Sequence, residues 1–399
     1  SALSRSHREP EMSNDATENP VADAAAAGAP AEAPVANPEG TKPPEPVKKS
    51  CTPGLTGWMR RNALSIAFTS YQSGRLYLLG ADPKGRLSFH ERFYQRAMGI
   101  VGNGQRLFMG GLYQIWRFEN ILRAGQAAND MFDRCYVPRT AQFTGAIDIH
   151  ELGIRKGGTV VFVNTRYNCL CVPSLTHSFK VIWKLGFISK IVPEDRCHLN
   201  GLAMRDGKPK YVTAVCRSDT IDGWRDRRHD GGVVIDVETN EIVCEGLSMP
   251  HSPRWADGKL WVLNSGTGYL GTVDFETRRF VPHVFCPGFL RGLAIKNGFA
   301  AVGLSKPRNA RFDGLELQQN LEAKDSQAWC GVQIVDLRSG SVVEWVRLDG
   351  PVTELFDVTF IDDVTCPMAL GQQSPENLSL VSIEDGLASQ EAGASRLTA

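Results

Sequence analysis

The chain lacks several features that mark common classes of protein. Neither charge is in excess, since 44 Lys and Arg residues balance 44 Asp and Glu residues among 399. Without a net positive charge, a protein that binds nucleic acid or a membrane surface over a broad basic face is not expected. No apolar run reaches the ~18 residues of a membrane-spanning helix. The N-terminus also lacks a charged segment followed by an apolar core, the pattern of a secretory signal peptide.

Motifs for several kinds of chemistry are missing too. The 10 cysteines include no Cys-x-x-Cys pair, which argues against a structural zinc knuckle. Most of them stand beside apolar residues, as buried free thiols do, so we expect a cytoplasmic protein with reduced thiols. The chain has neither a glycine-rich phosphate loop nor a Gly-x-Ser-x-Gly nucleophile elbow. Stretches with helical periodicity are scarce, and residues 115–128 are the best candidate for a helix.

The two ends of the chain differ in composition from its centre. Residues 1–52 are rich in Ala, Pro and Glu and contain no aromatic residue. Such a segment cannot bury enough apolar surface to offset the entropy lost on ordering, so the composition predicts a disordered tail. Residues 372–399 are similarly polar and predict a second disordered tail. The N-terminal tail is also the part of the chain that we would expect to contact a protein partner.

The central residues, 57–371, consist of short apolar runs separated by turn residues. The runs are rich in Val, Leu, Ile and aromatic residues and are bounded by Gly, Asn, Asp and Pro, as β-strands are. A polar loop followed by a short buried run recurs about every 40 to 65 residues, which is near the period of four-stranded blade repeats. The buried residues of the six copies are Ile100, Ile149, Leu202, Trp255, Leu293 and Val358.

This repeat predicts an all-β fold, a six-bladed β-propeller in which each copy begins the innermost strand of a blade. Residues 63–89 contain three strands but no start signal, and only one or two strands follow Val358. We therefore predict that the last blade is closed by N-terminal and C-terminal strands together, which leaves no open sheet edge in the ring.

Polar residues in the loops of one propeller face are candidate ligand-binding residues. The loops that lead into the innermost strands and those that join the second and third strands open on this face, the mouth of the ring. Their arginines suit a carboxylate or phosphate, which predicts a small anionic ligand or a peptide. The alternative is that they pair with Asp148, Glu354 and other acids and join the blades. The candidates are Arg96, Asn164, Arg166, Asn200, Arg217, Asn264, Arg291 and Asp357.

A second set of mouth residues has the chemistry of metal ligands. His198, His251 and Glu354 each stand four residues before the aligned buried residue of their blade. Imidazole and carboxylate groups suit one divalent metal ion, and three protein ligands would leave positions open for water and substrate. This set predicts a metal-dependent hydrolase or lyase as an alternative function. The other interpretation is that each histidine bonds to backbone carbonyls between blades.

Two further features bear on function. Residues 219–230 are a dense run of mixed charge, for which a solvated loop is the ordinary interpretation, but their Trp224 could cover the mouth. A protein-interaction scaffold with an inert centre is a third function that a propeller can have, and fold alone does not choose among the three.

One blade resembles known propellers. Residues 198–203, His-Leu-Asn-Gly-Leu-Ala, resemble the Asn-Gly-Leu-Ala pattern of calcium-dependent gluconolactonase-like and strictosidine-synthase-like six-bladed propellers. In the lactonase-like group, Asn and acidic side chains from several blades hold a metal. Here Asn200 matches, but the equivalent positions hold Met98, Pro253 and Arg291, so the resemblance does not extend to that site.

The whole core, residues 57–371, more closely resembles an uncharacterised bacterial family of conserved hypothetical proteins. The likeness is carried by residues 166–170 (Arg-Tyr-Asn-Cys-Leu), 198–201 (His-Leu-Asn-Gly) and 249–254 (Met-Pro-His-Ser-Pro-Arg). No activity is assigned to that family, so this resemblance implies a fold and leaves the function open.

Overall fold

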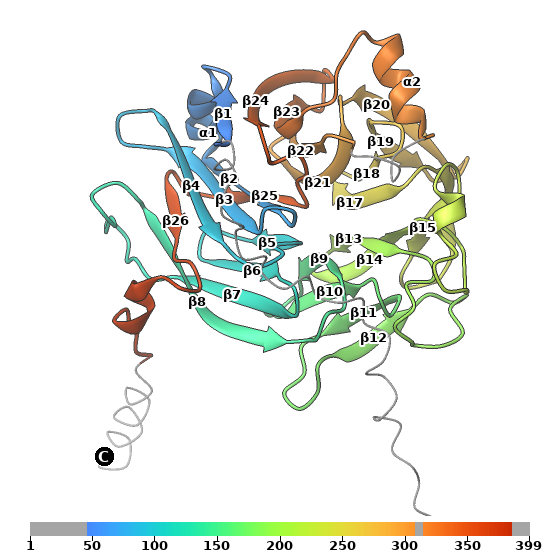
Figure 1. The fold of residues 1–399 in the computed structure, drawn as a ribbon, viewed down its shortest axis with the longest axis horizontal. Helices are drawn as coiled ribbons and strands as arrows, with labels where there is room; N and C mark the ends of the chain where they lie inside the picture. The colour runs from blue at the N-terminus through green and yellow to red at the C-terminus, as the bar shows by residue number, and fades with distance from the viewer. Residues whose placement is uncertain (1–45, 308–313, 385–399) are drawn as a thin grey trace, which may run out of the picture. The chain divides into compact units, whose positions relative to one another are not determined.

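The computed structural model describes residues 46–307 and 314–384, and within them the strands form six sheets arranged around a common axis (Figure 1). Each innermost strand contacts the innermost strand of the next sheet, and the last contacts the first, so the six close a ring. This arrangement confirms the predicted six-bladed β-propeller. All six start signals identified in the sequence lie at or in these innermost strands, which are β5, β9, β13, β17, β21 and β25.

Blade 1 is built from both ends of the described chain, as predicted. Its innermost strand β25 comes from the C-terminal part and pairs antiparallel with β2 from the N-terminal part, from Leu64 opposite Asp362 to Phe68 opposite Val358. The pairing joins segments about 290 residues apart, at an entropic cost that grows only slowly with loop length. The strands of blade 1, from the axis outward, are β25 (Val358–Asp362), β2 (Leu64–Ser70), β3 (Arg75–Ala81) and β4 (Leu87–Phe93).

Blades 2 and 6 each carry a fifth strand on the outer edge. In blade 2, β26 pairs parallel with β8, and in blade 6, β1 pairs antiparallel with β24. The added strands cover backbone groups that would otherwise face solvent at the edge. Blade 2 consists of β5 (Ile100–Gly102), β6 (Arg106–Gly110), β7 (Gln114–Asn120), β8 (Arg134–Phe143) and β26 (Pro367–Ala369). Blade 6 consists of β21 (Phe289–Lys296), β22 (Phe299–Ser305), β23 (Cys330–Asp336), β24 (Ser341–Asp349) and β1 (Lys48–Cys51).

Blades 3, 4 and 5 are four-stranded antiparallel meanders. Blade 3 consists of β9 (Ile149–Ile154), β10 (Val160–Asn164), β11 (Cys169–Val172) and β12 (Lys180–Lys184). Blade 4 consists of β13 (Leu199–Arg205), β14 (Lys208–Ala214), β15 (Gly232–Asp236) and β16 (Ile242–Leu247). Blade 5 consists of β17 (Pro250–Ala256), β18 (Lys259–Asn264), β19 (Tyr269–Asp274) and β20 (Arg279–Phe285).

Short helices lie at the margins of the ring. Helix α1 (Leu55–Asn62) buries Leu55, Trp58 and Met59 over the seam between blades 6 and 1, where the Trp58 ring meets Phe299 at 5.3 Å and Phe360 at 5.9 Å between ring centroids. Helix α2 (Glu316–Ala323) lies between β22 and β23, and 3₁₀ turns occur at Arg225–Arg227 and Pro375–Leu378. None of the helices in the described residues is long and apolar enough to cross a membrane.

The helix predicted at residues 115–128 is wrong. Residues 114–120 form β7, which pairs with β6 on one side and β8 on the other. The strand has buried residues on both faces, since Ile115 packs toward blade 3 and Phe118 toward blade 1. A strand covered on both faces loses the alternation of polar and apolar residues, and its apolar spacing then resembles that of a helix.

The folded part begins earlier than the sequence indicated. Residues 48–51, inside the predicted tail 1–52, form β1, and Lys49 pairs with Glu91 at 2.9 Å. This strand is held by backbone pairing to the edge of blade 6, which a polar sequence can supply as well as an apolar one. Residues 372–384 include the second 3₁₀ turn. The rest of both predicted tails, residues 1–45 and 385–399, lies outside the described residues.

The core of the propeller lies between neighbouring blades. Apolar side chains of successive blades pack against each other, as where Phe68 and Tyr77 of blade 1, whose rings stack at 4.8 Å, share one cluster with Val332 and Ile334 of blade 6. All ten cysteines fall in the described part of the chain; each is a free thiol, and all but Cys51 are buried. Burial raises the pKa of most of these thiols, for example that of Cys244 to about 12, so they act as small apolar core residues.

A buried ion cluster joins three blades near the axis. The guanidinium of Arg254 in β17 lies 2.6 Å from Glu151 in β9 and 3.8 Å from Asp357, which directly precedes β25. The two carboxylates also accept hydrogen bonds from backbone N–H groups of Leu202 and Ile100 in the next blades. These bonds offset the cost of removing the charges from water.

The seam gives a first prediction. Phe360 is 6% exposed and packs on Trp58, so truncating it to Ala should lower the free energy of unfolding by about 3 to 5 kcal/mol. The matched control is Phe143→Ala in blade 2, a ring that is 65% exposed, for which about 0.5 kcal/mol or less is expected. Urea unfolding of the two variants measures the difference, and equal losses would contradict the described closure.

The ion cluster gives a second prediction. Burial, and then the charge of Glu151, raise the pKa of Asp357 to about 7, whereas an Asp in the unfolded chain titrates near about 3.9. The folded protein therefore keeps a proton that the unfolded chain releases, and this stabilisation is lost as pH rises from about 4 to about 7. Across that window the free energy of unfolding of Asp357→Asn should rise relative to the wild type. A difference that stays constant in urea unfolding at successive pH values would be inconsistent with this assignment.

Candidate functional site

A cavity of about 460 Å³ opens at the mouth of the ring. Every blade contributes to its lining, mostly from the residues that lead into the innermost strands. Its walls combine apolar and aromatic side chains with several charges. The lining side chains are Tyr71 and Phe356 of blade 1; Arg96 and Met98 of blade 2; Asp148 and His150 of blade 3; Asp195, His198, Trp224, Arg225, Asp226 and Arg228 of blade 4; Met249 of blade 5; and Arg291 of blade 6.

His150 is held in one tautomer by its neighbours. The Thr165 hydroxyl donates its proton to the carbonyl oxygen of Leu199 at 2.6 Å, and Nδ1 of His150 lies 2.7 Å from the same hydroxyl oxygen. Because that hydroxyl has only one proton, it must accept from His150, so Nδ1 carries the ring proton. Burial outweighs the opposing charge of Asp148 and, with smaller effects of His198 and Arg291, lowers the pKa of His150 to about 4, so the ring is neutral at pH 7. The lone pair is then on Nε2.

His251 repeats this arrangement two blades further on. Its Nδ1 donates to the carbonyl oxygen of Met249 at 2.8 Å and lies 3.2 Å from the Ser265 hydroxyl, which donates to the carbonyl of Leu290. Its Nε2 is buried and has no hydrogen-bond partner within the described residues. Burial, with the charge of Arg291 next in size, lowers the pKa of His251 well below its usual range. This second neutral imidazole is buried and does not line the cavity.

His198 occupies a different position and has a different partner. Its Nδ1 lies 2.8 Å from the Asp195 carboxylate, to which it donates. The ring is 4.9 Å from that of His150, nearly perpendicular to it, and 4.3 Å from the ring of Trp224. The guanidinium of Arg225 also lies over the Trp224 ring, 4.6 Å from its centre. The loop of blade 4 therefore lays Trp224 over the histidine at the mouth, the position considered for it from the sequence.

Arg291 is the basic residue of the mouth that has no acidic partner in the described part of the chain. Its guanidinium lies between 5.3 and 5.6 Å from the ring centres of Tyr71, Phe289 and Phe356. Its Nε is buried and no hydrogen-bond acceptor of the described residues reaches it. Aromatic faces stabilise a cation only in part, so the half-buried guanidinium retains its Nε–H as an unused donor.

Arg96 is paired, in contrast. It contacts Asp148 at 2.8 Å, and this bond joins blade 2 to blade 3. Burial opposes the charge of Asp148, but His150 and Arg96 outweigh it and lower the pKa of that carboxyl. Arg96 therefore follows the alternative interpretation from the sequence, in which arginines join blades, although it also lines the cavity.

Of the eleven residues selected from the sequence, Arg96, His198 and Arg291 line the cavity. Asn164 and Asn264 end β10 and β18 and accept hydrogen bonds from the backbone N–H groups of Tyr167 and Ser248. Arg217 is exposed at a separate hollow on the outside of blade 4. Arg166 lies in the turn after β10, where its carbonyl accepts from the N–H of Asp195. None of these four residues lines the mouth cavity.

The remaining selected residues are bonded within the protein. Asp357 belongs to the ion cluster with Arg254, and Asn200 accepts a hydrogen bond from Thr213 at 2.7 Å. Glu354 accepts a hydrogen bond from the Tyr71 hydroxyl. His251 is buried below the lining, as described above.

The predicted metal set is not assembled. Within the described residues, no group of three or more His, Cys, Asp and Glu side chains is placed to hold a metal ion. The calcium site that the lactonase-like resemblance implies also finds no fit, because the buried carboxylates Glu151 and Asp357 already bind the guanidinium of Arg254, and Asn200 accepts from Thr213. A metal therefore stays a prediction that no contact supports.

The sequence alignment of the blades placed His198 and His251 at equivalent positions, and the register corrects this. His198 precedes the first residue of β13, as Asp148 precedes β9 and Met249 precedes β17, and all three have left-handed φ angles of 49° to 59°. His251 is the second residue of its strand and corresponds to His150. Counting back four residues from the buried residue of each blade did not give equivalent positions, because the innermost hairpins contain register shifts. One sequence pattern could have identified His150. In blades 3 and 5 a histidine is the second residue of the innermost strand, and a Thr or Ser directly follows the second strand of the same blade.

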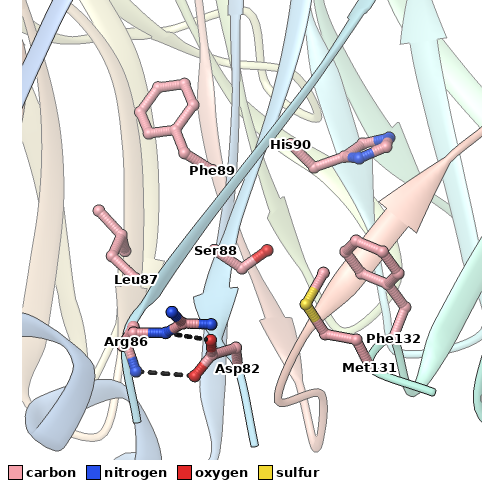
Figure 2. A pocket seen from close by; sticks show the side chains of 8 residues that line it. All are labelled: Asp82, Arg86, Leu87, Ser88, Phe89, His90, Met131 and Phe132. Atoms are coloured by element: carbon pink, nitrogen blue, oxygen red, sulfur yellow. Dashed lines mark hydrogen bonds and ion pairs between the residues drawn. The ribbon is translucent and has the colours of Figure 1, made fainter. Parts of the chain in front are cut away.

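A second hollow, of about 410 Å³, lies between blades 1 and 2, away from the mouth (Figure 2). Asp82 and Arg86 of the turn before β4 face each other across one end, with 2.8 Å between Oδ2 and Nε. His90 donates from Nε2 to the carbonyl of Ala369 at 2.8 Å and meets the ring of Phe132. These polar groups are bonded within the protein, so the hollow has the character of a packing gap.

Comparison with known proteins identifies a family. Residues 53–370 match the family model described as a domain of unknown function, DUF4915. The chain belongs to the DUF4915 family. This confirms the expected membership of a family without an assigned activity. No curated protein matches this DUF4915 chain.

Two solved structures illustrate similar proteins. A chain in a crystal structure of a nidogen/laminin complex is 12% identical, with a TM-score of 0.48 over 74% of the DUF4915 chain and 98% of its own length. A protein of unknown function from Bacteroides caccae is 11% identical, with a TM-score of 0.44 over 75% of this chain and 99% of its own.

The lowered pKa of His150 gives a third prediction. Its pKa of about 4 in the folded protein lies below the value of about 6.5 in the unfolded chain, which therefore binds more protons between these limits. Stability from this residue is complete above about pH 6.5 and is lost as pH falls toward about 4. Replacing His150 by Gln should make the free energy of unfolding less dependent on pH in that range. The same slope in both proteins, measured by urea unfolding, would show that His150 titrates normally.

Proposed function

We propose that the mouth cavity of this DUF4915 propeller binds a small anionic ligand, and that Arg291 is its main anchor. The observation that carries the proposal is a guanidinium without an acidic partner in the described residues, with a buried Nε that no acceptor reaches. A buried N–H donor without an acceptor is costly unless an anion or another hydrogen-bond acceptor completes it. A carboxylate fits a guanidinium through two parallel hydrogen bonds.

The other charges of the cavity are mostly paired. Asp148 is paired with Arg96, Arg225 is paired with Asp222 at 3.1 Å, and Asp195 accepts the hydrogen bond of His198. Asp226 also lines the cavity, and His150 is neutral. Arg291 is a cation of the lining without an ion-pair partner among the described residues, and a bound anion would complete it.

The size and walls of the cavity limit the ligand. A volume of about 460 Å³ is within the range of pockets that enclose small molecules, about 300 to 1,000 Å³. Tyr71, Trp224 and Phe356 supply aromatic walls, and Met98 and Met249 supply adaptable apolar ones. These features support a small carboxylic acid with an apolar body in preference to a peptide or an inorganic anion.

The other two functions lack such support. A metal-dependent hydrolase or lyase would need a ligand set that the described residues do not form. A scaffold with an inert centre would have no need for an unpaired guanidinium among three aromatic rings. A protein partner of the N-terminal tail would act mainly through residues 1–45, which lie outside the described chain.

Isothermal titration calorimetry tests the proposal and gives a fourth prediction. The panel is acetate, benzoate, 3-phenylpropionate, phenylpyruvate and inorganic phosphate. Arg291→Met should weaken binding of the tightest carboxylate at least tenfold, because a charge-assisted hydrogen bond contributes about 1.5 to 3 kcal/mol. The matched control is Arg217→Met, an exposed arginine outside the cavity, which should bind as the wild type does. Unchanged affinity in Arg291→Met, or no binding of any anion by the wild type, would refute the proposal.

A further inference from the structure

The histidines of the mouth are arranged for more than binding. His150 and His198 come from adjacent blades, both line the cavity, and their ring centres are 4.9 Å apart. Each uses Nδ1 for a bond within the protein, to Thr165 in one case and to Asp195 in the other. No described residue bonds to either Nε2, so both atoms are available to a ligand in the cavity.

The two rings are fixed in different ways, which suits them to different steps. His150 is held by a neutral hydroxyl whose own proton is committed to the Leu199 carbonyl. Its Nε2 therefore presents a lone pair and can only accept a proton. His198 is held by a carboxylate, the partner that stabilises an imidazolium when one forms.

We infer that the mouth is an acid–base site, in which His150 removes a proton from a carbon of the bound anion while His198 protonates the oxygen of its carbonyl group. The inference rests on the proposed function, since Arg291 must first hold the carboxylate. Proton removal from carbon without a cofactor needs a neighbouring carbonyl that can take the electron pair. A 2-keto carboxylic acid with an apolar side chain has both groups and suits the aromatic walls.

The step balances without another reactant. The C3–H bond breaks and its proton goes to Nε2 of His150, while the electron pair forms the C2–C3 double bond. The carbonyl π electrons move to oxygen, which takes a proton from Nε2 of the protonated His198. The keto acid becomes its enol, and the two rings then exchange their protons with water. Return of a proton from water to C3 completes a tautomerisation cycle.

Two positioning residues follow from the same contacts. Thr165 fixes the tautomer of His150 and Asp195 fixes the orientation of His198, and neither needs to touch the substrate. Thr165→Ser keeps the hydroxyl, whereas Thr165→Val removes it at nearly equal volume. The serine variant should therefore retain the Nδ1–H form of His150, and the valine variant should populate the Nε2–H form as well.

The first test needs no substrate. Nitrogen-15 NMR of the histidine-labelled protein, with His150→Gln used to assign the signals, reports which ring nitrogen carries the proton. The inference predicts the Nδ1–H form for His150 near neutral pH, and a mixture in Thr165→Val. An Nε2–H form of His150 in the wild type would overturn the role given to it.

The second test follows exchange at carbon. The C3 protons of phenylpyruvate and 2-oxobutyrate are monitored by proton NMR in D₂O with the full-length protein. Wild-type protein should accelerate their replacement by deuterium, and His150→Gln should lose at least about 100-fold of that acceleration, the usual size of a base contribution. Binding of phenylpyruvate by His150→Gln should stay within a few-fold of wild type. His177→Gln, at an exposed loop of blade 3, is the matched control and should exchange as the wild type does.

The outcomes separate this inference from the proposed function. If a keto acid binds but its protons exchange only at the buffer rate, or exchange is unchanged in His150→Gln, the acid–base inference fails and anion binding stands. If the other carboxylates bind and neither keto acid does, the substrate class is wrong. Loss of all binding in the wild type would remove the proposed function and this inference together.

Discussion

The pairing of β25 with β2 is the constraint on which the rest of the molecule depends. It places β25, from the C-terminal part of the propeller, as the innermost strand of blade 1, beside β2 from the N-terminal part. This pairing also positions the two residues just before β25. Phe356 lines the mouth cavity, and Asp357 contacts Arg254 and accepts a hydrogen bond from the N–H of Ile100. Without this closure, neither the cavity nor the ion cluster would be complete. Helix α1 covers the same seam with Trp58.

Two half-buried arginines near the axis differ in their partners, and this difference separates a structural role from a ligand-binding one. Arg254 lies between Glu151 and Asp357, and its charge is used to join blades 3, 5 and 1. Arg291 is surrounded by aromatic rings and has no acidic partner among the described residues. The charge of Arg254 is paired and stabilises the contacts between blades, whereas the charge of Arg291 at the mouth cavity is available to a ligand. The contrast between the two is the physical basis for placing the site at the mouth.

The fold could be predicted from the sequence more completely than the site. Strand starts such as Ile149 and Val358 are set by local patterns of burial and turns, and these recur in every blade, so the number of blades and the mode of closure could be predicted. The mouth depends on register, and shifts such as the one between His251 and Arg254 move a side chain by one or two positions. For that reason His150 was missed, while Asn164 and Asn264 were selected although their side chains bond to the backbone N–H groups of Tyr167 and Ser248.

Long-range pairing also explains what the sequence could not show. Nothing near Arg291 in the sequence indicates that Tyr71, from the N-terminal part of the propeller, and Phe356, from its C-terminal part, would lie against it. The same is true of β1, whose polar residues give no strand signal and whose partner strand is about 300 residues away. Such contacts are fixed by the closed ring and become visible only once all six blades are in place.

A crystal structure of the protein grown with benzoate is the most direct test of Arg291 as an anion anchor. We expect a carboxylate bound by two N–H groups of the Arg291 guanidinium, with the aromatic ring of the ligand against the walls formed by Tyr71, Trp224 and Phe356. An Arg291 side chain paired with a protein carboxylate, or a mouth filled by its own side chains and free of benzoate, would contradict it.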